Sequence, residues 1–463
     1  MEQPSSPVLT FLGAARTVTG SKFLVDTPTQ RVLVDCGQYQ GPRELRQRNW
    51  DGIGVGPSSI DAVVLTHAHV DHCGMLPVLV RDGFRGPVFC TPSTAELVSI
   101  VLPDSGRLAE EEARFAARRG YSRHQPVLPL FTEHDAMVAL DSLVTVPFGA
   151  VHERHDWSFR FGRAGHILGS AWAHLEVAGD HSVVFTGDLG RSDHALLSPP
   201  EPRPSAKVVV TESTYGDREH PLDDPADLLG EVIRRTIKRG GSVVIPAFAV
   251  DRTDVLLHQL RRLQMAGAIP EVPIHLDSPM SARALAVYAD AFEDGAPDAR
   301  PELVGTHPFA VDGLRVVRDV EESKALNENP RPMIIVSASG MLTGGRVVHH
   351  VAHRIGDERN TILLVGYQAA GTRGRRLQDG ERTLKMLGRY WPVRAEIAHL
   401  GTMSVHADRN GLLEWIGSGP DDPEMVYAVH GEPAAAWSLV GAVGDRLGLP
   451  AVAPALGERV LLG

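Results

Sequence analysis

The chain has 463 residues, with 46 Lys and Arg against 57 Asp and Glu, and its formal net charge is −11. An apolar fraction of 43% and a charged fraction of 22% are ordinary for a globular protein and exclude disordered and fibrous classes. No apolar run is long enough to cross a membrane, the N-terminus lacks the basic and apolar segments of a signal peptide, and the acidic balance argues against non-specific coating of nucleic acid.

Three scattered cysteines, Cys36, Cys73 and Cys90, argue against a disulfide scaffold and predict a cytoplasmic chain. Because histidine is abundant, with 21 residues, and cysteine is scarce, any metal site is expected to use His and Asp. The length suits two or three domains of ordinary size. The sequence leaves the oligomeric state open, a dimer included.

Short apolar runs rich in Val and Ile recur along the chain and are typical of buried strands. They lie at residues 31–35, 62–66, 182–186, 207–211, 242–245, 333–336, 361–365 and 425–429. An alternating pattern predicts a further strand at 171–177. Apolar residues at helical spacing predict helices over 224–239 and 253–265. The alternation of the two patterns predicts an α/β protein whose helices pack on sheets.

Two proline-marked stretches, residues 198–204 and 390–394, look like domain boundaries. The segment between them has strands and helices of its own and the size of a domain. The sequence therefore suggests a middle domain flanked by two other pieces of chain.

The strongest chemical signal directly follows the apolar run at 62–65, where His67, His69, Asp71 and His72 fall within six residues. Neutral imidazole is an excellent zinc ligand, and a carboxylate adds a hard oxygen. His67 and His69 can converge on one ion, whereas Asp71 and His72 lie past the bend and can face a second. The alternative interpretation is a solvated polar turn. It is the weaker of the two, because four ligand-type residues fall within this one turn.

Two metal ions need more than four ligands, and further candidates are expected at strand ends. His166, Asp188 and His430 each lie at such a position beside a glycine, which allows the backbone to approach a site closely. Taken singly, each would be an ordinary loop residue. Taken together, they complete a ligand set of seven.

The HxHxDH motif, the Gly-His before a strand, the Thr-Gly-Asp and the late His430 together resemble the metallo-β-lactamase superfamily. Asp35, in Leu-Val-Asp-Cys-Gly, is similar to the acid of that superfamily's first motif. Glu212, His406 and His430 resemble motifs A, B and C of the β-CASP branch. The tracts at 336–346 and 366–368 also resemble those of β-CASP ribonucleases. The residues just before His406, Met-Ser-Val, depart from the expected pattern but leave His-Ala-Asp intact.

The resemblance covers essentially the whole chain and implies an αββα metallo-β-lactamase sandwich with an inserted α/β β-CASP domain. The sandwich would comprise residues 1–214 and 396–463, and the insert residues 215–395. The implied activity is hydrolysis of RNA phosphodiester bonds by a compact, stand-alone nuclease, endonucleolytic, exonucleolytic or both.

Two Zn²⁺ ions are implied as cofactors. One would be held by His67, His69 and His166 and the other by Asp71, His72 and His430, with Asp188 bridging them. Water activated between the ions would attack phosphorus, so that Asp71 belongs to the catalytic set as well.

Asp35 would accept the second N–H of a ligand imidazole and so fix its orientation; on sequence grounds, a strand-end carboxylate that caps a turn is as good an interpretation. Glu212 and His406 would pair, so that His406 stays protonated and contacts the scissile phosphate or protonates the leaving oxygen. The alternative for this pair is a buried structural ion pair.

Residues 331–395 contain eleven Arg or Lys and four acids, a net +7 that leaves −18 for the rest of a chain whose total is −11. Glycine-rich turns expose N–H groups to phosphate, and arginine forks bind it. The predicted RNA-contacting residues are Ser337, Ser339, Gly340, Thr343, Gly344, Arg346, Arg373, Arg375 and Arg376. The alternative is a solvated basic helix face.

Two other functions remain open at this point. A metallo-β-lactamase-fold hydrolase of a small ester, thioester or lactam would have similar ligands but would not need Glu212, His406 or a large insert. A non-catalytic β-CASP scaffold would have lost ligands, whereas all seven candidates are present here.

Overall fold

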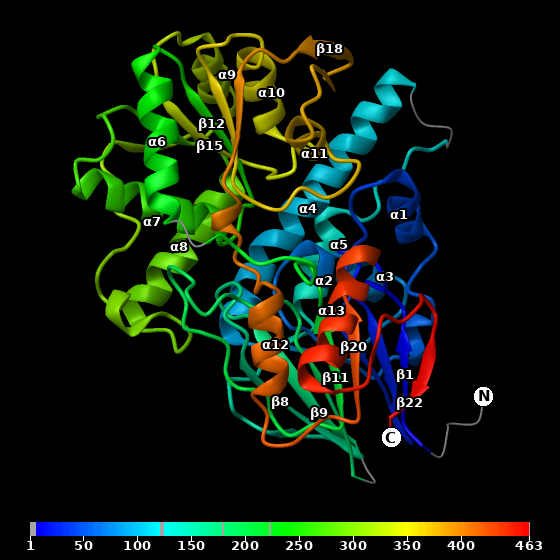
Figure 1. The fold of residues 1–463 in the computed structure, drawn as a ribbon. Coiled ribbons are helices and arrows are strands. Elements are labelled where there is room, and N and C mark those ends of the chain that lie inside the picture. The colour runs from blue at the N-terminus through cyan, green and yellow to red at the C-terminus, as the bar shows by residue number, and fades with distance from the viewer. Residues whose placement is uncertain (1–5, 121–124, 178–179, 222–223, 463) are drawn as a thin grey trace. The chain divides into compact units, whose positions relative to one another are not determined.

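A computed structural model describes residues 6–120, 125–177, 180–221 and 224–462 (Figure 1). Its internal packing divides the chain into two compact units. Unit 1 consists of Met1–Glu219 together with His406–Gly463, and unit 2 consists of His220–Val405. Among the described residues, no helix has both the length and the apolar character needed to cross a membrane.

Unit 1 contains two seven-stranded sheets. In spatial order, the first contains β22 (Arg459–Leu461), β1 (Val8–Phe11), β2 (Phe23–Asp26), β3 (Arg31–Val34), β4 (Ala62–Val64), β5 (Val88–Cys90) and β6 (Leu143–Thr145). The second contains β21 (Ala451–Val452), β20 (Met425–Val429), β11 (Val208–Glu212), β10 (His181–Phe185), β9 (Ala171–Val177), β8 (Trp157–Arg163) and β7 (His152–Glu153). The strands β10, β11, β20 and β21 are parallel, so their carboxyl ends meet at one edge.

The main core of unit 1 lies between these sheets. Phe11, Phe23 and Val34 of the first sheet belong to one buried cluster with Phe159 and Phe185 of the second. All residues of β1, β2 and β11 are buried, as expected for strands covered on both faces.

Helices pack outside this core. The helices α12 (Arg409–Gly417) and α13 (Pro433–Leu447) share a second cluster with the outer face of β9, β10, β11 and β20. The helices α2 (Val70–Cys73), α3 (Leu76–Arg81), α4 (Pro92–Arg119) and α5 (Glu133–Leu140) pack on one another and against β6, and α1 (Arg43–Gln47) precedes them. The predicted αββα sandwich is confirmed.

Unit 2 is built on a six-stranded parallel sheet. In spatial order it contains β14 (Leu314–Val316), β13 (Ile274–Leu276), β15 (Ile334–Ala338), β12 (Val243–Ala247), β16 (Thr361–Leu364) and β19 (Glu396–His399). Its helices are α6 (Pro225–Lys238), α7 (Arg252–Met265), α8 (Pro279–Asp294), α9 (Val320–Glu328), α10 (Arg346–Arg354) and α11 (Arg373–Gln378). A two-stranded hairpin, β17 (Thr383–Met386) and β18 (Arg389–Pro392), leads into β19.

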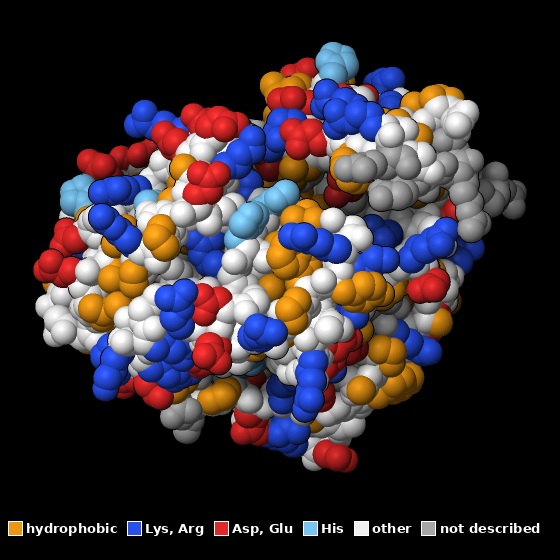
Figure 2. All heavy atoms as spheres, turned by 90° about the horizontal axis from the view of Figure 1, so that it is seen from above, with side chains coloured by type: hydrophobic (Ala, Val, Ile, Leu, Met, Phe, Trp, Pro, Cys, Tyr) orange, Lys and Arg blue, Asp and Glu red, His pale blue; other side chains and the backbone are white. Residues whose placement is uncertain are grey.

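Every strand expected from an apolar run is present, in places shifted by one or two residues, and so are both expected helices. The proline-rich stretch 198–204 lies inside unit 1, before β11, and residues 390–392 belong to β18 of unit 2. The predicted domain limits at 214/215 and 395/396 stay a prediction. On the face that Figure 2 shows, basic and acidic side chains alternate over the surface.

Candidate metal centre

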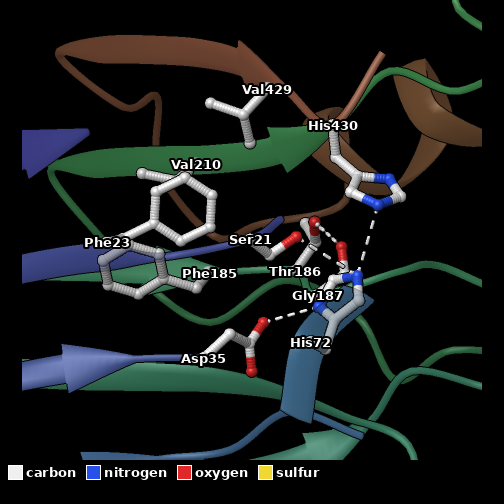
Figure 3. A pocket seen from close by; sticks show the side chains of 10 residues that line it. All are labelled: Ser21, Phe23, Asp35, His72, Phe185, Thr186, Gly187, Val210, Val429 and His430. Carbon is white, nitrogen blue, oxygen red and sulfur yellow. Dashed lines mark hydrogen bonds and ion pairs between the residues drawn. The ribbon is translucent and has the colours of Figure 1, made fainter. Parts of the chain in front are cut away.

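A small pocket in unit 1 brings together residues from four distant parts of the chain (Figure 3). His72 lies on the short helix α2, and His430 directly follows β20. Their Nε2 atoms are 3.3 Å apart, and His430 Nε2 is 3.6 Å from Asp71 Oδ2. One ligand atom from each of the three residues lies within 4.8 Å of the others. Asp71, His72 and His430 are called the pocket cluster below.

One side of this pocket is apolar: Phe23, Phe185, Val210 and Val429 lie to the left of the two imidazoles in Figure 3. These four side chains belong to the core between the two sheets. Water is excluded on that side, so charges at the pocket interact more strongly than they would in water.

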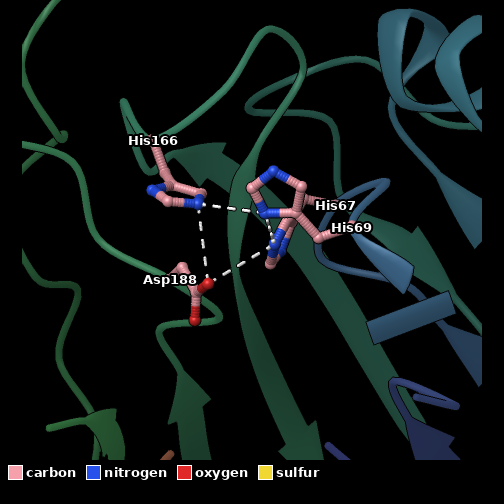
Figure 4. Close-up of side chains that lie close together, drawn as sticks. All are labelled: His67, His69, His166 and Asp188. Atoms are coloured by element: carbon pink, nitrogen blue, oxygen red, sulfur yellow. Dashed lines mark hydrogen bonds and ion pairs between the residues drawn. The ribbon is translucent and has the colours of Figure 1, made fainter. Parts of the chain in front are cut away.

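A second group of side chains meets beside this pocket (Figure 4). His67 and His69 lie in the loop between β4 and α2, His166 precedes β9, and Asp188 follows β10. His69 Nδ1 is 3.1 Å from His67 Nε2 and 3.2 Å from His166 Nε2. Asp188 Oδ2 is 3.6 Å from His67 Nε2 and 3.5 Å from His166 Nε2. These four residues are called the three-histidine cluster below.

Asp188 joins the two clusters through its two carboxylate oxygens. Oδ2 faces the three-histidine cluster, whereas Oδ1 is 3.3 Å from His72 Nε2 and 3.3 Å from His430 Nδ1. Burial alone would raise the pKa of Asp188, but the imidazoles of His430 and His72 outweigh it and hold that pKa well below its usual value. The carboxylate is therefore ionised between the two clusters.

The donor sets fit metal ions. Two nitrogens bound to one tetrahedral zinc at ~2.0–2.1 Å lie about 3.4 Å apart, close to the separations among the imidazoles here. Burial lowers the pKa of His67 and of His166 well below the usual imidazole value, so both are neutral. Neutral imidazole is the form that binds a metal.

Asp35 fixes the orientation of a ligand. Its Oδ2 lies 2.7 Å from His72 Nδ1 (Figure 3). The Thr66 N–H donates to Oδ1 at 2.8 Å. Asp35 adopts a positive φ of 57°. With Nδ1 engaged in this way, His72 directs Nε2 toward the cluster.

The loop after β3 touches the backbone of the ligand helix. A Cβ on Gly37 would lie 1.6 Å from Asp71 O, so only glycine fits where this loop contacts α2. The Cys36 N–H donates to His72 O at 2.7 Å, and the buried Lys22 ammonium donates to Gly37 O at 2.7 Å. Burial lowers the pKa of Lys22 to about 8. The contact between this loop and α2 therefore fixes the position of the two ligands on α2, Asp71 and His72.

Glu212 and His406 meet at the same end of the sheet. His406 Nδ1 is 3.1 Å and 3.2 Å from the two carboxylate oxygens of Glu212, which is fully buried. The Leu189 N–H donates to Glu212 Oε1 at 2.7 Å and fixes the carboxylate. A β-bridge between Gly190 and His406 holds the imidazole 4.4 Å, centroid to centroid, from that of His166. The side chain of His406 is 16% exposed, so it is reachable from solvent.

Three further polar side chains in the site were not expected from the sequence. Thr66 Oγ1 lies 2.9 Å from Asp35 Oδ2, Ser21 Oγ lies 3.3 Å from His72 Nε2, and Thr214 Oγ1 lies 3.3 Å from His430 Nδ1. Thr66 directly precedes His67, and Thr214 lies two residues after Glu212. Their positions within these motifs could have indicated that they belong to the site. Ser21 carries no such signal, because only the pairing of β2 with β3 brings it to the site.

The predicted RNA-contacting residues of unit 2 gather in two neighbouring segments. The first segment runs from the end of β15 through the following turn to the start of α10 and carries Ser337, Ser339, Gly340, Thr343, Gly344 and Arg346. The second is α11, which carries Arg373, Arg375 and Arg376. The Gly374 N–H donates to Met341 O at 3.1 Å and joins the two segments.

Within these segments, most polar groups already have protein partners. Ser337 Oγ donates to Asp277 O, and Arg346 pairs with the Asp277 carboxylate at 2.7 Å. Arg375 pairs with Asp379 at 2.9 Å and Arg376 with Glu381 at 2.6 Å. RNA contact by these residues stays a prediction.

Three family models match the chain. A β-lactamase superfamily domain matches residues 30–225, a β-CASP domain residues 254–377, and a Zn-dependent metallo-hydrolase RNA specificity domain residues 390–454. The chain therefore belongs to the β-CASP family within the metallo-β-lactamase superfamily. This family description and the His/Asp clusters both fit metal binding.

Among individual proteins, the chain is 39% identical to ribonuclease TTHA0252 of Thermus thermophilus over 422 residues, which are 91% of this chain and 92% of that protein. It is 34% identical to the transcription termination factor FttA of Methanosarcina mazei over 455 residues, 95% of this chain and 69% of that protein. A crystal structure of an Enterococcus faecalis protein of unknown function has a similar fold, with a TM-score of 0.54, 13% identity, and coverage of 99% of this chain and 100% of that one.

Proposed function

We propose that this protein is a zinc-dependent ribonuclease that hydrolyses RNA phosphodiester bonds. The observation that carries the proposal is the Glu212–His406 pair, whose imidazole lies 4.4 Å from that of His166, between ring centroids, in the three-histidine cluster. The 39% identity to a protein named as a ribonuclease, across 92% of that protein, supports RNA as the substrate.

In the proposed site, His67, His69 and His166 would hold one Zn²⁺ and Asp71, His72 and His430 would hold a second, with one carboxylate oxygen of Asp188 facing each cluster. Bound zinc would supply Lewis acidity and lower the pKa of water near the phosphate. Asp35 orients His72 and keeps its Nε2 free for the site.

The catalytic work of the chain itself falls to His406 and Glu212. His406 protonates the leaving oxygen or contacts the scissile phosphate from the exposed side of the site. Glu212 accepts from His406 Nδ1 and leaves Nε2 for the substrate. Because the Leu189 N–H fixes Glu212, the pair is oriented before substrate binds.

The remaining expectations complete the proposal. RNA contacts the two segments at 337–346 and 373–376. The β-CASP domain spans residues 215–395. The protein acts in the cytoplasm, where its three buried free cysteines stay reduced.

The test is the variant His406→Ala. Loss of a positioned general acid lowers turnover on RNA by about 100-fold or more, while zinc bound per chain is unchanged. Turnover is measured with RNA labelled at either end, and zinc by atomic emission. The matched control is His353→Ala, an exposed histidine of unit 2, which leaves both unchanged.

Loss of zinc in His406→Ala would make His406 a ligand and contradict its assignment. Parallel assays with bis(p-nitrophenyl) phosphate and a chromogenic β-lactam separate a phosphodiesterase from a small-molecule hydrolase. A wild-type protein that binds no zinc would instead be a scaffold.

A further inference from the structure

The hairpin formed by β17 and β18 in unit 2 has one buried face and one open face. Leu384 and Met386 point into the core with α10 and α11, and Trp391 packs partly on the same cluster. The opposite face carries Lys385 and its cross-strand partner Tyr390. Tyr390 is 67% exposed, an unusual position for a large aromatic side chain.

The unpaired positive charge of residues 331–395 is concentrated on this hairpin. Four arginines of the segment, Arg346, Arg359, Arg375 and Arg376, form ion pairs with carboxylates. Arg373 donates to three backbone carbonyls. Five exposed basic residues of the segment have no carboxylate partner among the described residues, and four of them lie on or beside the hairpin: Arg382, Lys385, Arg389 and Arg394. The fifth, Arg331, precedes β15.

Each aromatic ring of β18 has a cation against it, Lys385 at Tyr390 on the open face and Arg389 at Trp391 on the other face. Lys385 Nζ lies 5.7 Å from the centroid of the Tyr390 ring, and the Arg389 guanidinium lies 3.6 Å from the centroid of Trp391. A flat aromatic face beside fixed positive charges is the combination that holds an unpaired base and the phosphates that flank it.

The hairpin is tied to the segment already predicted to contact RNA. Arg373 Nε donates to Lys385 O at 2.9 Å, and Nη1 donates to Leu342 O at 2.8 Å and Thr343 O at 3.0 Å. One guanidinium therefore joins β17 to the glycine-rich turn before α10. An RNA chain that contacts that turn can continue onto the hairpin.

We propose that this hairpin is a binding site for single-stranded RNA, separate from the metal centre. Tyr390 stacks on one base, and Lys385, Arg389 and their two basic neighbours contact the flanking phosphates. The proposal rests on RNA as the substrate of the proposed function and adds a second point of attachment for it. A protein partner would have to bury four unpaired cations around one tyrosine, which is costly without matching acids.

The experiment measures binding of a fluorescein-labelled oligouridylate, which has no stable secondary structure, by the full-length metal-bound protein. His406→Ala serves as the background so that little RNA is consumed during the measurement, and intact RNA is verified on a gel. Tyr390→Ala weakens binding by about tenfold, whereas Tyr390→Phe keeps the ring and the affinity. Thermal unfolding of each variant shows that the fold is retained.

The charges are tested by salt dependence. In Lys385→Gln with Arg389→Gln, the slope of log Kd against log salt concentration falls by about 0.7 for each charge removed. Arg359→Gln removes one charge from the same segment, but its guanidinium already pairs with Asp357, so the slope is unchanged.

Unchanged affinity in Tyr390→Ala and an unchanged slope in the double variant would overturn the proposal. A change of oligomeric state in Tyr390→Ala, seen by sedimentation with RNA binding intact, would overturn it in favour of a protein contact. Because binding is measured without cleavage, failure of the nuclease assignment shows separately, as a wild-type protein that does not hydrolyse RNA.

Discussion

The side chain of Asp35 contacts two different parts of the site. It accepts from the Thr66 backbone at 2.8 Å and lies 2.7 Å from His72 Nδ1, so one carboxylate fixes both the strand end and the ligand ring. Its own backbone has a positive φ, which the surrounding hydrogen bonds stabilise. At the scale of single residues, the geometry of the site depends on residues that orient the ligands, such as Asp35, as much as on the ligands themselves.

Asp35→Asn is expected to weaken zinc binding by about 10- to 100-fold, because the amide no longer accepts strongly from His72 Nδ1. Zinc affinity is measured by competition with a chromogenic chelator. Asp445→Asn, an exposed position on α13, is the control and leaves affinity unchanged. Equal affinities in all three proteins would contradict the role of Asp35.

His174, on β9, gives unit 1 a sensitivity to acid. Burial, with a smaller contribution from the cross-strand Arg160, lowers the pKa of His174 to about 4. Between pH 4 and 6.5 the unfolded chain binds a proton that the folded chain does not, so stability falls as pH falls through this range. The full loss is about 3 kcal/mol, as an order of magnitude.

We therefore expect the free energy of unfolding of His174→Gln to decline less steeply with acid than that of the wild type. Denaturant titrations at several pH values measure this. His155→Gln, at an exposed histidine, keeps the wild-type slope. Identical slopes in wild type and His174→Gln would contradict the assignment.

At the scale of elements, the ligands are positioned by the contact between the loop after β3 and the helix α2. Gly37 lies directly against Asp71 O, while main-chain hydrogen bonds from Cys36 and Gln38 reach His72 O and Val70 O. Any side chain at position 37 must push this loop away from α2.

Gly37→Ala is expected to destabilise the fold by about 1–3 kcal/mol and to lower the zinc content, because the added methyl overlaps backbone. Gly56→Ala is the matched control, since a Cβ there has no atom within 4 Å and its φ of −64° suits alanine. Its stability stays within about 0.5 kcal/mol of the wild type. Chemical denaturation and metal analysis distinguish the two outcomes.

The elements that position the ligands could be predicted from sequence because Val- and Ile-rich runs end directly in ligand-type residues. The run at 62–65 leads into His67, and the run at 425–429 leads into His430. Both strands are covered on two faces, which produces the continuous apolar pattern that marks them.

The hairpin of unit 2 could not be predicted in this way. Its turn places Leu387 at φ 52° and Gly388 at φ 81°, a left-handed pair that usually requires Asn or Asp before Gly. With leucine there, the turn signal is missing, and Pro392 looked like an interruption instead of the end of β18. The ion pairs that neutralise Arg375 and Arg376 were also invisible, since charge counts do not show which groups meet.

At the scale of the whole molecule, the two units have separate cores, and every residue of both metal clusters belongs to unit 1. A bound ion stabilises only the part of the chain that binds it. To a first approximation, metal binding therefore does not change the free energy of unfolding of unit 2.

Removal of metal by a chelator is expected to lower the melting temperature of unit 1 and to leave that of unit 2 unchanged. Differential scanning calorimetry resolves the two transitions, and added zinc restores the first. The shift grows with free zinc concentration, as expected for binding to the folded state. An equal shift of both transitions would show that the units unfold together.

The order of the site residues along the chain has a consequence for synthesis. His406 and His430 belong to unit 1 but follow all of unit 2 in the sequence, and β20, which ends at Val429 just before His430, pairs with β11 in the middle of its sheet. A chain still on the ribosome therefore has the three-histidine cluster long before it has the pocket cluster or the Glu212–His406 pair. Hydrolytic activity therefore requires that translation has passed His430, after all of unit 2 has been made.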